Sequence, residues 1–257
     1  MDPVKRFSTR ADNYAKYRPG YPAGVIAILQ AACGLEASST IADVGSGTGI
    51  LTEMFLKNGN RVFAIEPNAA MRLVAERHLA NYPGFLSVNA AAEDTTLADQ
   101  SVDFVAAAQA FHWFDRKRAK QEFARILKPE GWVVLIWNER RLDSTPFLRA
   151  YEDLLLRYGT DYEKVRHETV ATEIAEFFAP SGFQLKNLEN YQHFDFESLK
   201  GRVLSSSYTP EPDHSNFEPM LKELQETFAA HEKDGIVSFE YETKIYYGRL
   251  GSLQAEA

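Results

Sequence analysis

Three glycines in the stretch IADVGSGTGI have a spacing that suits ligand binding. Gly45, Gly47 and Gly49 lie two residues apart, between a predicted buried strand and a predicted helix. They place bare backbone at the carboxyl end of that strand, where open α/β sheets bind their ligands. The next predicted strand ends at Glu66, whose carboxylate would lie beside the glycines and accept hydrogen bonds from both hydroxyls of a ribose. These residues predict a site for a ribose-containing ligand.

Two phosphate-binding motifs with similar glycines do not fit this stretch. The dinucleotide fingerprint G-x-G-x-x-G, counted from Gly45, places Ile50 at the third glycine position. A P-loop would require a Gly-Lys-Ser/Thr ending, which is absent here. The alternatives that involve no ligand are a tight strand-to-helix turn for the glycines and, for Glu66, a carboxylate that stabilises the N-terminus of the following helix.

The elements that must position these residues follow from the alternation of short apolar runs with helical patterns. Strands are predicted at 40–44, 61–65, 85–89, 102–109 and 132–138. Helices are predicted between them at 50–58, 69–81 and 115–127. This rhythm predicts an α/β fold with a doubly wound, mostly parallel, Rossmann-like sheet of about seven strands. The last strands, at 184–196 and 236–249, and an added helical cap are expected from the patterns after residue 138.

Composition limits the compartment and the partners. The chain has 257 residues, 45% of them hydrophobic, with no apolar run long enough for a membrane helix and no signal-peptide core at its start, so we expect a cytoplasmic protein. A single cysteine, Cys33, excludes an internal disulfide. The net charge of -8 disfavours binding to nucleic acid or to an anionic membrane. The histidines show no metal-ligand spacing, so we expect no metal site.

Five segments occur in order along the chain: DVGSGTG, AIEPNAAM, AAAED, SVDFVAAAQAFHWF and RILKPEGWVVLIW. Together, over roughly residues 40–138, they resemble the successive motifs of class I S-adenosylmethionine-dependent methyltransferases. The segments FSTRADNYAKYRPGYP and HWFD resemble more narrowly the branch that contains trans-aconitate methyltransferase. The resemblance implies S-adenosylmethionine as the cofactor and methyl transfer to a small molecule. We expect one methyltransferase domain over 1–257, with an N-terminal lid segment (1–35), a cofactor-binding core (36–138) and substrate-side helices and last strands (139–257), although the resemblance is weak beyond about residue 160.

The same resemblance assigns residues to parts of the cofactor. Its methionine part would lie against Gly45, Ser46, Gly47 and Gln109, its ribose on Glu66, and its adenine between Pro67 and Met71. The family's acidic adenine ligand is replaced here by Ala91, which leaves adenine recognition to the backbone near Ala92 and to Glu93. The resemblance also folds Tyr14 and Arg18 over the cofactor, with Arg18 paired to its carboxylate. The alternative for these two residues is a lid that only packs.

On the substrate side, His112 is the candidate general base, although it would also pack within the run Phe111–Phe114. Trp113 would lie near the sulfonium and the acceptor. Residues 116–118 are all cationic at a predicted helix start, which either forms a solvated face capped by Asp115 or attracts an anion. Together with Arg140 and Arg141 and the trans-aconitate resemblance, they favour a carboxylate acceptor and a methyl ester product. The alternatives are N- or C-methylation of another metabolite, a non-catalytic S-adenosylmethionine-binding protein and, least favoured, a dinucleotide oxidoreductase. Nothing in the sequence indicates the oligomeric state.

Overall fold

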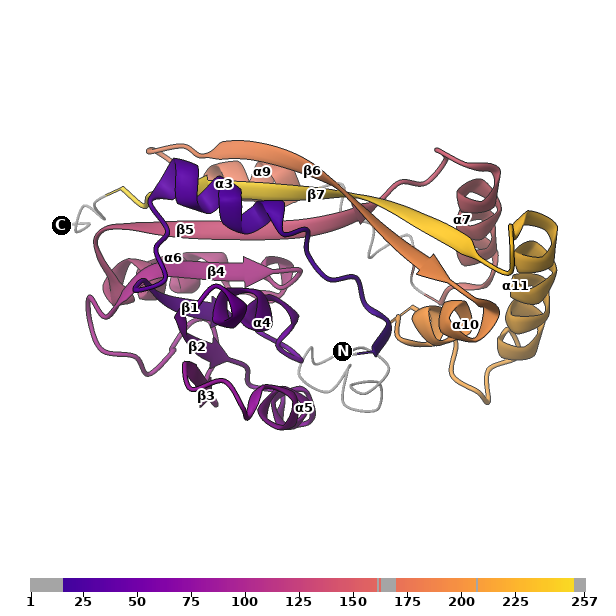
Figure 1. Ribbon diagram of the computed structural model, residues 1–257, viewed down its shortest axis with the longest axis horizontal. Coiled ribbons are helices and arrows are strands. Elements are labelled where there is room, and N and C mark those ends of the chain that lie inside the picture. The colour runs from indigo at the N-terminus through magenta and orange to yellow at the C-terminus, as the bar shows by residue number, and fades with distance from the viewer. Residues whose placement is uncertain (1–15, 161, 163–169, 207, 252–257) are drawn as a thin grey trace.

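The computed structural model describes residues 16–160, 162, 170–206 and 208–251. Its seven strands form one sheet in the order β3-β2-β1-β4-β5-β7-β6 (Figure 1). The strands are β1 (Thr40–Val44), β2 (Arg61–Ile65), β3 (Phe85–Val88), β4 (Val102–Ala108), β5 (Leu127–Arg140), β6 (Gln184–Phe194) and β7 (Val237–Gly248). The first five are parallel, and β7 is antiparallel to β5 and β6. The predicted doubly wound, mostly parallel sheet is confirmed, and its strand order reverses between β1 and β4, where such sheets open a crevice.

Helices cover both faces of the sheet, as the helical patterns predict. The helices and the one 3-10 turn are α3 (Gly24–Cys33), α4 (Ile50–Lys57), α5 (Ala69–Leu79), η1 (Phe111–Trp113), α6 (Arg116–Ile126), α7 (Pro146–Tyr158), α9 (Val170–Phe178), α10 (Phe196–Leu204) and α11 (Phe217–His231). On one face, buried side chains of α3, α4 and α5 pack against the sheet in a cluster that includes Leu29 and Phe55. On the other face, α6 and α9 contribute Phe123 and Phe177 to a second cluster.

A third hydrophobic cluster lies outside these two layers and forms the helical cap. It joins α7, α10 and α11 to the far ends of β6 and β7 through residues such as Tyr151, Leu199, Leu224 and Phe239. Figure 1 shows these three helices gathered beyond the end of the core sheet. The strands β5, β6 and β7 have 14, 11 and 12 residues, and this length lets them run through both the core and the cap.

One helix was not predicted from the sequence. Helix α3 lies in the segment that we expected to be part of a lid, but it packs on the sheet with Val25 and Leu29 fully buried. Its sequence GVIAILQAAC is apolar nearly throughout, and the residue before it makes no side-chain cap, so neither a polar face nor a start signal marks it. Tertiary burial therefore decides its structure.

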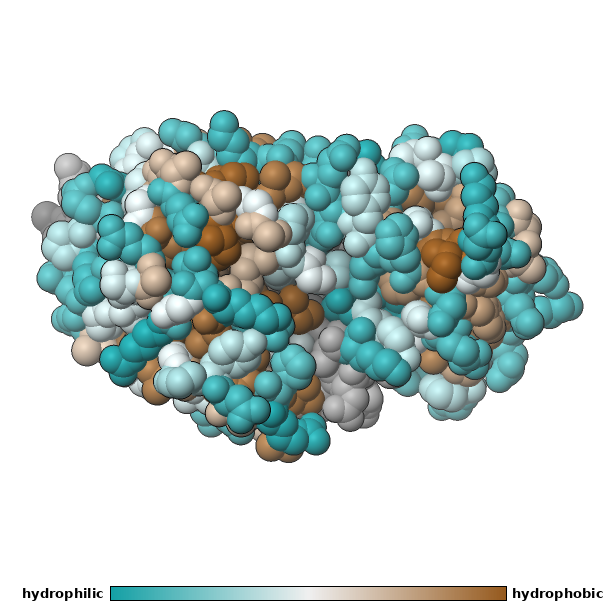
Figure 2. Space-filling model, viewed as in Figure 1, coloured by the Kyte–Doolittle hydropathy of each residue, from teal (hydrophilic) through white to brown (hydrophobic). Residues whose placement is uncertain are grey.

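The face of the molecule shown in Figure 2 is covered mainly by hydrophilic side chains, with hydrophobic ones gathered chiefly over α3. Within the described residues, no helix combines the length and the apolar character that crossing a bilayer requires. The same part of the chain contains no cluster of three His, Cys, Asp or Glu side chains that could hold a metal ion.

The cap cluster leads to a prediction about stability. We expect Leu224→Ala to lower the free energy of unfolding by about 2–5 kcal/mol, because this α11 side chain is fully buried in the cap cluster. The matched control is Leu73→Ala on α5, where the leucine is 52% exposed and the expected change is within about 0.5 kcal/mol. Urea unfolding followed by circular dichroism measures both, and equal losses would contradict the packing described here.

Candidate functional site

The glycine turn after β1 has a backbone that other residues do not readily adopt. Gly45 and Gly47 have φ angles of 68° and 58°, in the left-handed region that favours glycine. A Cβ atom on Gly45 would lie 2.6 Å from the Cβ of Ala110, whereas one on Gly47 would meet no protein atom within 4 Å. Gly45 is therefore required by both conformation and packing. Gly47 instead faces open space.

Glu66 ties the end of β2 to this turn. Its Oε2 accepts a hydrogen bond of 2.9 Å from the Gly47 N–H, and its Oε1 accepts one of 2.8 Å from the Asn68 N–H. The residue is only 9% exposed, and burial raises the pKa of its carboxyl although both N–H donors oppose the shift. Each carboxylate oxygen retains a second lone pair, so Glu66 can still accept from a ligand hydroxyl.

Asp43, near the end of β1, is a residue of this candidate site to which the sequence interpretation gave no role. It belongs to the quoted segment DVGSGTG, but no role was assigned to it. Its Oδ2 accepts a hydrogen bond of 2.5 Å from Thr52 Oγ1, while its buried Oδ1 has no hydrogen-bond partner in the described part of the chain. Burial raises the pKa of Asp43 to about 7. A cationic ligand group would satisfy this oxygen.

The opposite wall comes from the end of β4 and from η1. Gln109 has a positive φ of 55°, an unusual conformation for a residue other than glycine, and its Nε2 donates to the Asn138 carbonyl over 3.0 Å. Trp113 and Phe114 follow in and after η1. Glu93 lies on a neighbouring loop, where its Oε1 accepts a 2.7 Å hydrogen bond from the Asp115 N–H. Polar and aromatic groups thus face the glycine turn across the sheet edge.

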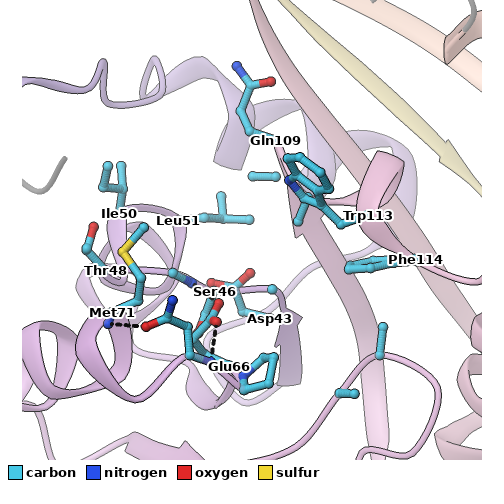
Figure 3. Close-up of a pocket in the computed structure, with 18 of the residues that line it drawn as sticks. Asp43, Ser46, Thr48, Ile50, Leu51, Glu66, Met71, Gln109, Trp113 and Phe114 are labelled. Atoms are coloured by element: carbon cyan, nitrogen blue, oxygen red, sulfur yellow. Dashed lines mark hydrogen bonds between the residues drawn. The ribbon is translucent and has the colours of Figure 1, made fainter. Parts of the chain in front are cut away.

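These residues line one cavity at the carboxyl ends of the parallel strands (Figure 3). In that view Ser46, Glu66 and Met71 lie on one side, and Gln109 and Trp113 on the other. The predicted site residues that line it are Gly45, Ser46, Gly47, Glu66, Pro67, Met71, Ala92, Glu93, Gln109 and Trp113. Residues lining it that had no assigned role are Tyr21, Asp43, Thr48, Ile50, Leu51, Asn68, Ala91, Ala108, Ala110 and Phe114.

Four predicted residues that the structure describes, Arg18, His112, Arg140 and Arg141, are not among the described lining residues of this cavity. Tyr14 lies outside the described residues. His112 is on η1, with its ring 4.6 Å from that of Trp113, but is not among the described lining residues. The Arg18 guanidinium donates to the Ser205 carbonyl over 3.2 Å, on the cap side. Arg140 is buried in the cap beside Glu152.

Two of the other predicted cations, Arg141 and Arg116, lie beside acidic side chains. Arg141 lies 3.5 Å from Glu189 and 3.8 Å from Glu240. At the start of α6, Arg116 lies 3.2 Å from Glu173, and the Asp115 side chain caps the helix by accepting from the Arg118 N–H. This geometry supports the interpretation of residues 116–118 as a capped, solvated face.

Comparison with known proteins agrees with this geometry. A family model described as a methyltransferase domain matches residues 42–135. An uncharacterised methyltransferase-like protein of Schizosaccharomyces pombe is 31% identical over 181 residues, which cover 70% of this chain and 68% of that one. The chain belongs to the methyltransferase family. It is an S-adenosylmethionine-dependent methyltransferase of class I.

Further relatives agree with this assignment. An uncharacterised methyltransferase of Mycobacterium tuberculosis is 38% identical to this methyltransferase over 167 residues, which cover 65% of this chain and 64% of that one, slightly less than two thirds of its length. Among solved structures, one described as a type II methyltransferase from Anaeromyxobacter dehalogenans superposes with a TM-score of 0.69 at 24% identity, covering 91% of this chain and 98% of that one. At that identity the likeness supports the fold alone.

Asp43 generates a prediction about the pH dependence of stability. The folded protein binds the Asp43 proton more tightly than the unfolded chain, so this stabilising contribution is complete below the ordinary aspartate pKa and is lost as the pH rises to about 7. We therefore expect Asp43→Asn to flatten the fall in unfolding free energy between about pH 4 and pH 7, by on the order of 1–3 kcal/mol. Chemical denaturation of the ligand-free protein at several pH values measures this.

Asp153→Asn is the control for that experiment, since it removes the same charge from an exposed position on α7. Its profile should keep the shape of the unsubstituted protein's profile. Identical profiles for all three proteins would show that burial does not hold the Asp43 proton.

Proposed function

We propose that the cavity at the glycine turn holds S-adenosylmethionine and that the enzyme transfers its methyl group to a small-molecule acceptor. The observation that carries this proposal is the pair of buried carboxylates, Asp43 and Glu66, on either side of an open glycine backbone. Glu66 suits the two ribose hydroxyls. The unpartnered Oδ1 of Asp43 suits a positive charge, and S-adenosylmethionine carries an ammonium and a sulfonium. The residues present therefore fit this cofactor.

The remaining roles follow from the positions around the cavity. Gly45, Ser46 and Gly47 would contact the methionine part, together with Gln109 from the opposite wall. The adenine would lie between Pro67 and Met71 on one side and the segment Ala91–Glu93 on the other. Ala91 lines the cavity with no carboxylate to offer, so backbone groups and Glu93 remain for the adenine amino group. The contact of Tyr14 stays a prediction.

The chemistry requires little from side chains. S-adenosylmethionine supplies an electrophilic methyl group, which an acceptor displaces in line from the sulfur. The protein's task is to align the acceptor and to exclude water. Trp113 and Phe114 provide apolar surface at the wall where the acceptor would approach. We propose that the acceptor lies between this wall and residues 139–257. We therefore propose that residues 36–138 form the cofactor-binding core and that residues 139–257 form the acceptor side.

We propose a carboxylate as the accepting group, which gives a methyl ester. The ionisable side chains among the described lining residues are Tyr21, Asp43, Glu66 and Glu93, and none of these residues is a lysine, an arginine or a histidine. A carboxylate is already ionised at neutral pH and needs no base, so its methylation does not require one of the missing basic side chains. The resemblance of FSTRADNYAKYRPGYP and HWFD to the trans-aconitate methyltransferase branch supports the same acceptor class. We propose a cytoplasmic enzyme with no nucleic-acid partner, as the net charge of -8 favours.

Binding of S-adenosylhomocysteine tests the cofactor site. We expect Glu66→Ala to weaken its affinity by about 1–3 kcal/mol, because two ribose hydroxyls would lose a charged acceptor. Glu218→Ala, an exposed position on α11, removes the same charge far from the cavity and should bind as tightly as the unsubstituted protein. Isothermal titration calorimetry measures all three. If Glu66→Ala binds with unchanged affinity, the ribose lies elsewhere.

Turnover with a panel of carboxylic acids, amines and phenols tests the acceptor class. Formation of S-adenosylhomocysteine with carboxylic acids alone is the expected result; activity confined to amines or phenols would point to N-methylation or to a base-assisted reaction.

With a carboxylate acceptor, His112→Ala should retain turnover within about tenfold and should leave cofactor binding unchanged, since no base is required. Loss of about 100-fold or more, with cofactor binding intact, would assign His112 as the general base. No turnover across the panel, despite cofactor binding, would favour a non-catalytic binding protein.

A further inference from the structure

Two buried arginines in the cap approach the same aromatic ring. The Cζ atoms of Arg140 and Arg202 each lie 5.8 Å from the centre of the Phe239 ring, and Arg140 also lies 4.8 Å from that of Tyr151. The Arg140 side chain is 10% exposed and Arg202 is 6% exposed. We call Arg140, Arg202 and Tyr151 the cap arginine site.

Three guanidinium groups lie near one another around this site. Arg18 is a third guanidinium nearby, since Arg202, Arg18 and Arg140 all act on the hydroxyl of Tyr208. Burial would raise the pKa of Tyr208, but these three cations outweigh it and hold that pKa below its ordinary value. In the described part of the chain, the carboxylate that pairs with Arg140 is Glu152, which lies 2.5 Å from Arg140 Nη2.

The site also contains buried donors that the described residues do not use. Arg140 Nη2 donates to Glu152 and to the Tyr162 hydroxyl, but Arg140 Nη1 has no partner in the described part of the chain. Arg202 Nη1 donates to Ser206 Oγ over 2.9 Å, whereas Arg202 Nε and the Tyr151 hydroxyl have none there. Buried polar atoms are normally hydrogen-bonded, and leaving a charged donor unsatisfied costs more than leaving a neutral one. These atoms are therefore placed for a ligand that accepts hydrogen bonds.

The cap arginine site is connected to the cofactor cavity by two short routes. Asn138, two residues before Arg140 on β5, has its carbonyl bonded to Gln109 of the cavity wall. A step of two residues along a strand is about 7 Å. The Asn138 side chain also donates to the Gly20 carbonyl, next to Tyr21, which lines the cavity, while Arg18 in the same segment turns toward the cap. The cap arginine site and the cofactor cavity are therefore linked through β5 and through the segment 18–21.

From this arrangement we propose that the cap arginine site binds an oxyanion of the methyl acceptor, remote from the atom that is methylated. The acceptor is then a small molecule with a carboxylate or phosphate group held by Arg140, Arg202 and Tyr151. Its reacting end extends along β5 toward the cofactor. The assignment of this anion to the acceptor rests on the proposed methyl transfer. Planar guanidiniums and a phenol hydroxyl suit either oxyanion.

The test measures anion binding without turnover. Glutarate and inorganic phosphate are titrated separately into the full-length protein saturated with S-adenosylhomocysteine, with sodium chloride used to hold the ionic strength constant. We expect at least one of them to bind. Replacing one charged donor should weaken that binding about tenfold to 100-fold in Arg140→Met and in Arg202→Met. Tighter binding of glutarate would identify a carboxylate, and tighter binding of phosphate a phosphate group.

Two further sets of variants keep the test decisive. Arg157→Met removes an exposed guanidinium from α7 in the same cap and should bind the anion as the unsubstituted protein does. Arg140→Lys and Arg202→Lys keep the buried charge if the methionine variants do not fold, and they should still weaken binding because lysine lacks the guanidinium's fixed fork of donors. An unchanged affinity for S-adenosylhomocysteine shows in each case that the cofactor site is intact.

Each outcome bears on one proposal. If neither anion binds the unsubstituted protein, or if the Arg140 and Arg202 variants bind it as tightly as Arg157→Met, the cap arginine site is overturned while the proposed methyl transfer stands. If the protein binds an anion through these arginines but does not bind S-adenosylhomocysteine, the anion site is supported and the proposed function fails.

Discussion

The hydrogen bond from the Gly47 N–H to the Glu66 carboxylate joins the ends of two neighbouring parallel strands, β1 and β2. It depends on a backbone conformation that glycine supplies and on a carboxylate that burial would otherwise disfavour. The bond holds the turn in one conformation, and Gly47 leaves open space in front of it. The turn therefore forms a fixed wall of the cavity. The rest of the site is arranged around that wall, with Asp43 beneath it and Gln109 and Trp113 across from it.

The two proposed ligand sites contain buried groups of opposite charge. The cofactor cavity contains buried carboxylates, whereas the cap contains buried guanidiniums, of which Arg140 pairs with Glu152. A cationic methyl donor and an anionic acceptor would each find the complementary environment, and the reacting atoms would meet at the boundary between the two. Specificity for the donor and for the acceptor would then be set by separate elements, the ends of the parallel strands and the cap.

Much of the core could be predicted because its signals are local. The apolar runs at β1, β2 and β4, and the Asn68 and Asp115 caps of α5 and α6, mark those elements in the sequence itself. The motif residues from Gly45 to Gln109 accordingly line one cavity. The helical cap was expected from the sequence, but its buried arginines were beyond this approach, since Arg18, Arg140 and Arg202 are far apart in sequence and come together only in the folded chain. Helix α3 was not predicted for a different reason, because its sequence is apolar nearly throughout and has no polar face that would mark a helix.

The lengths of β5 and β7 have a mechanical consequence. Both strands pass without interruption from the core into the cap, and they remain paired along the way from Val133 with Gly248 to Arg140 with Tyr241. A hinge needs a few residues free to change their backbone angles, and a continuous hydrogen-bonded ladder offers none between these points. The cap strands therefore cannot swing away as a rigid flap. If the acceptor enters through a movement of the cap, that movement would have to come from the cap helices α7, α10 and α11 rather than from the strands.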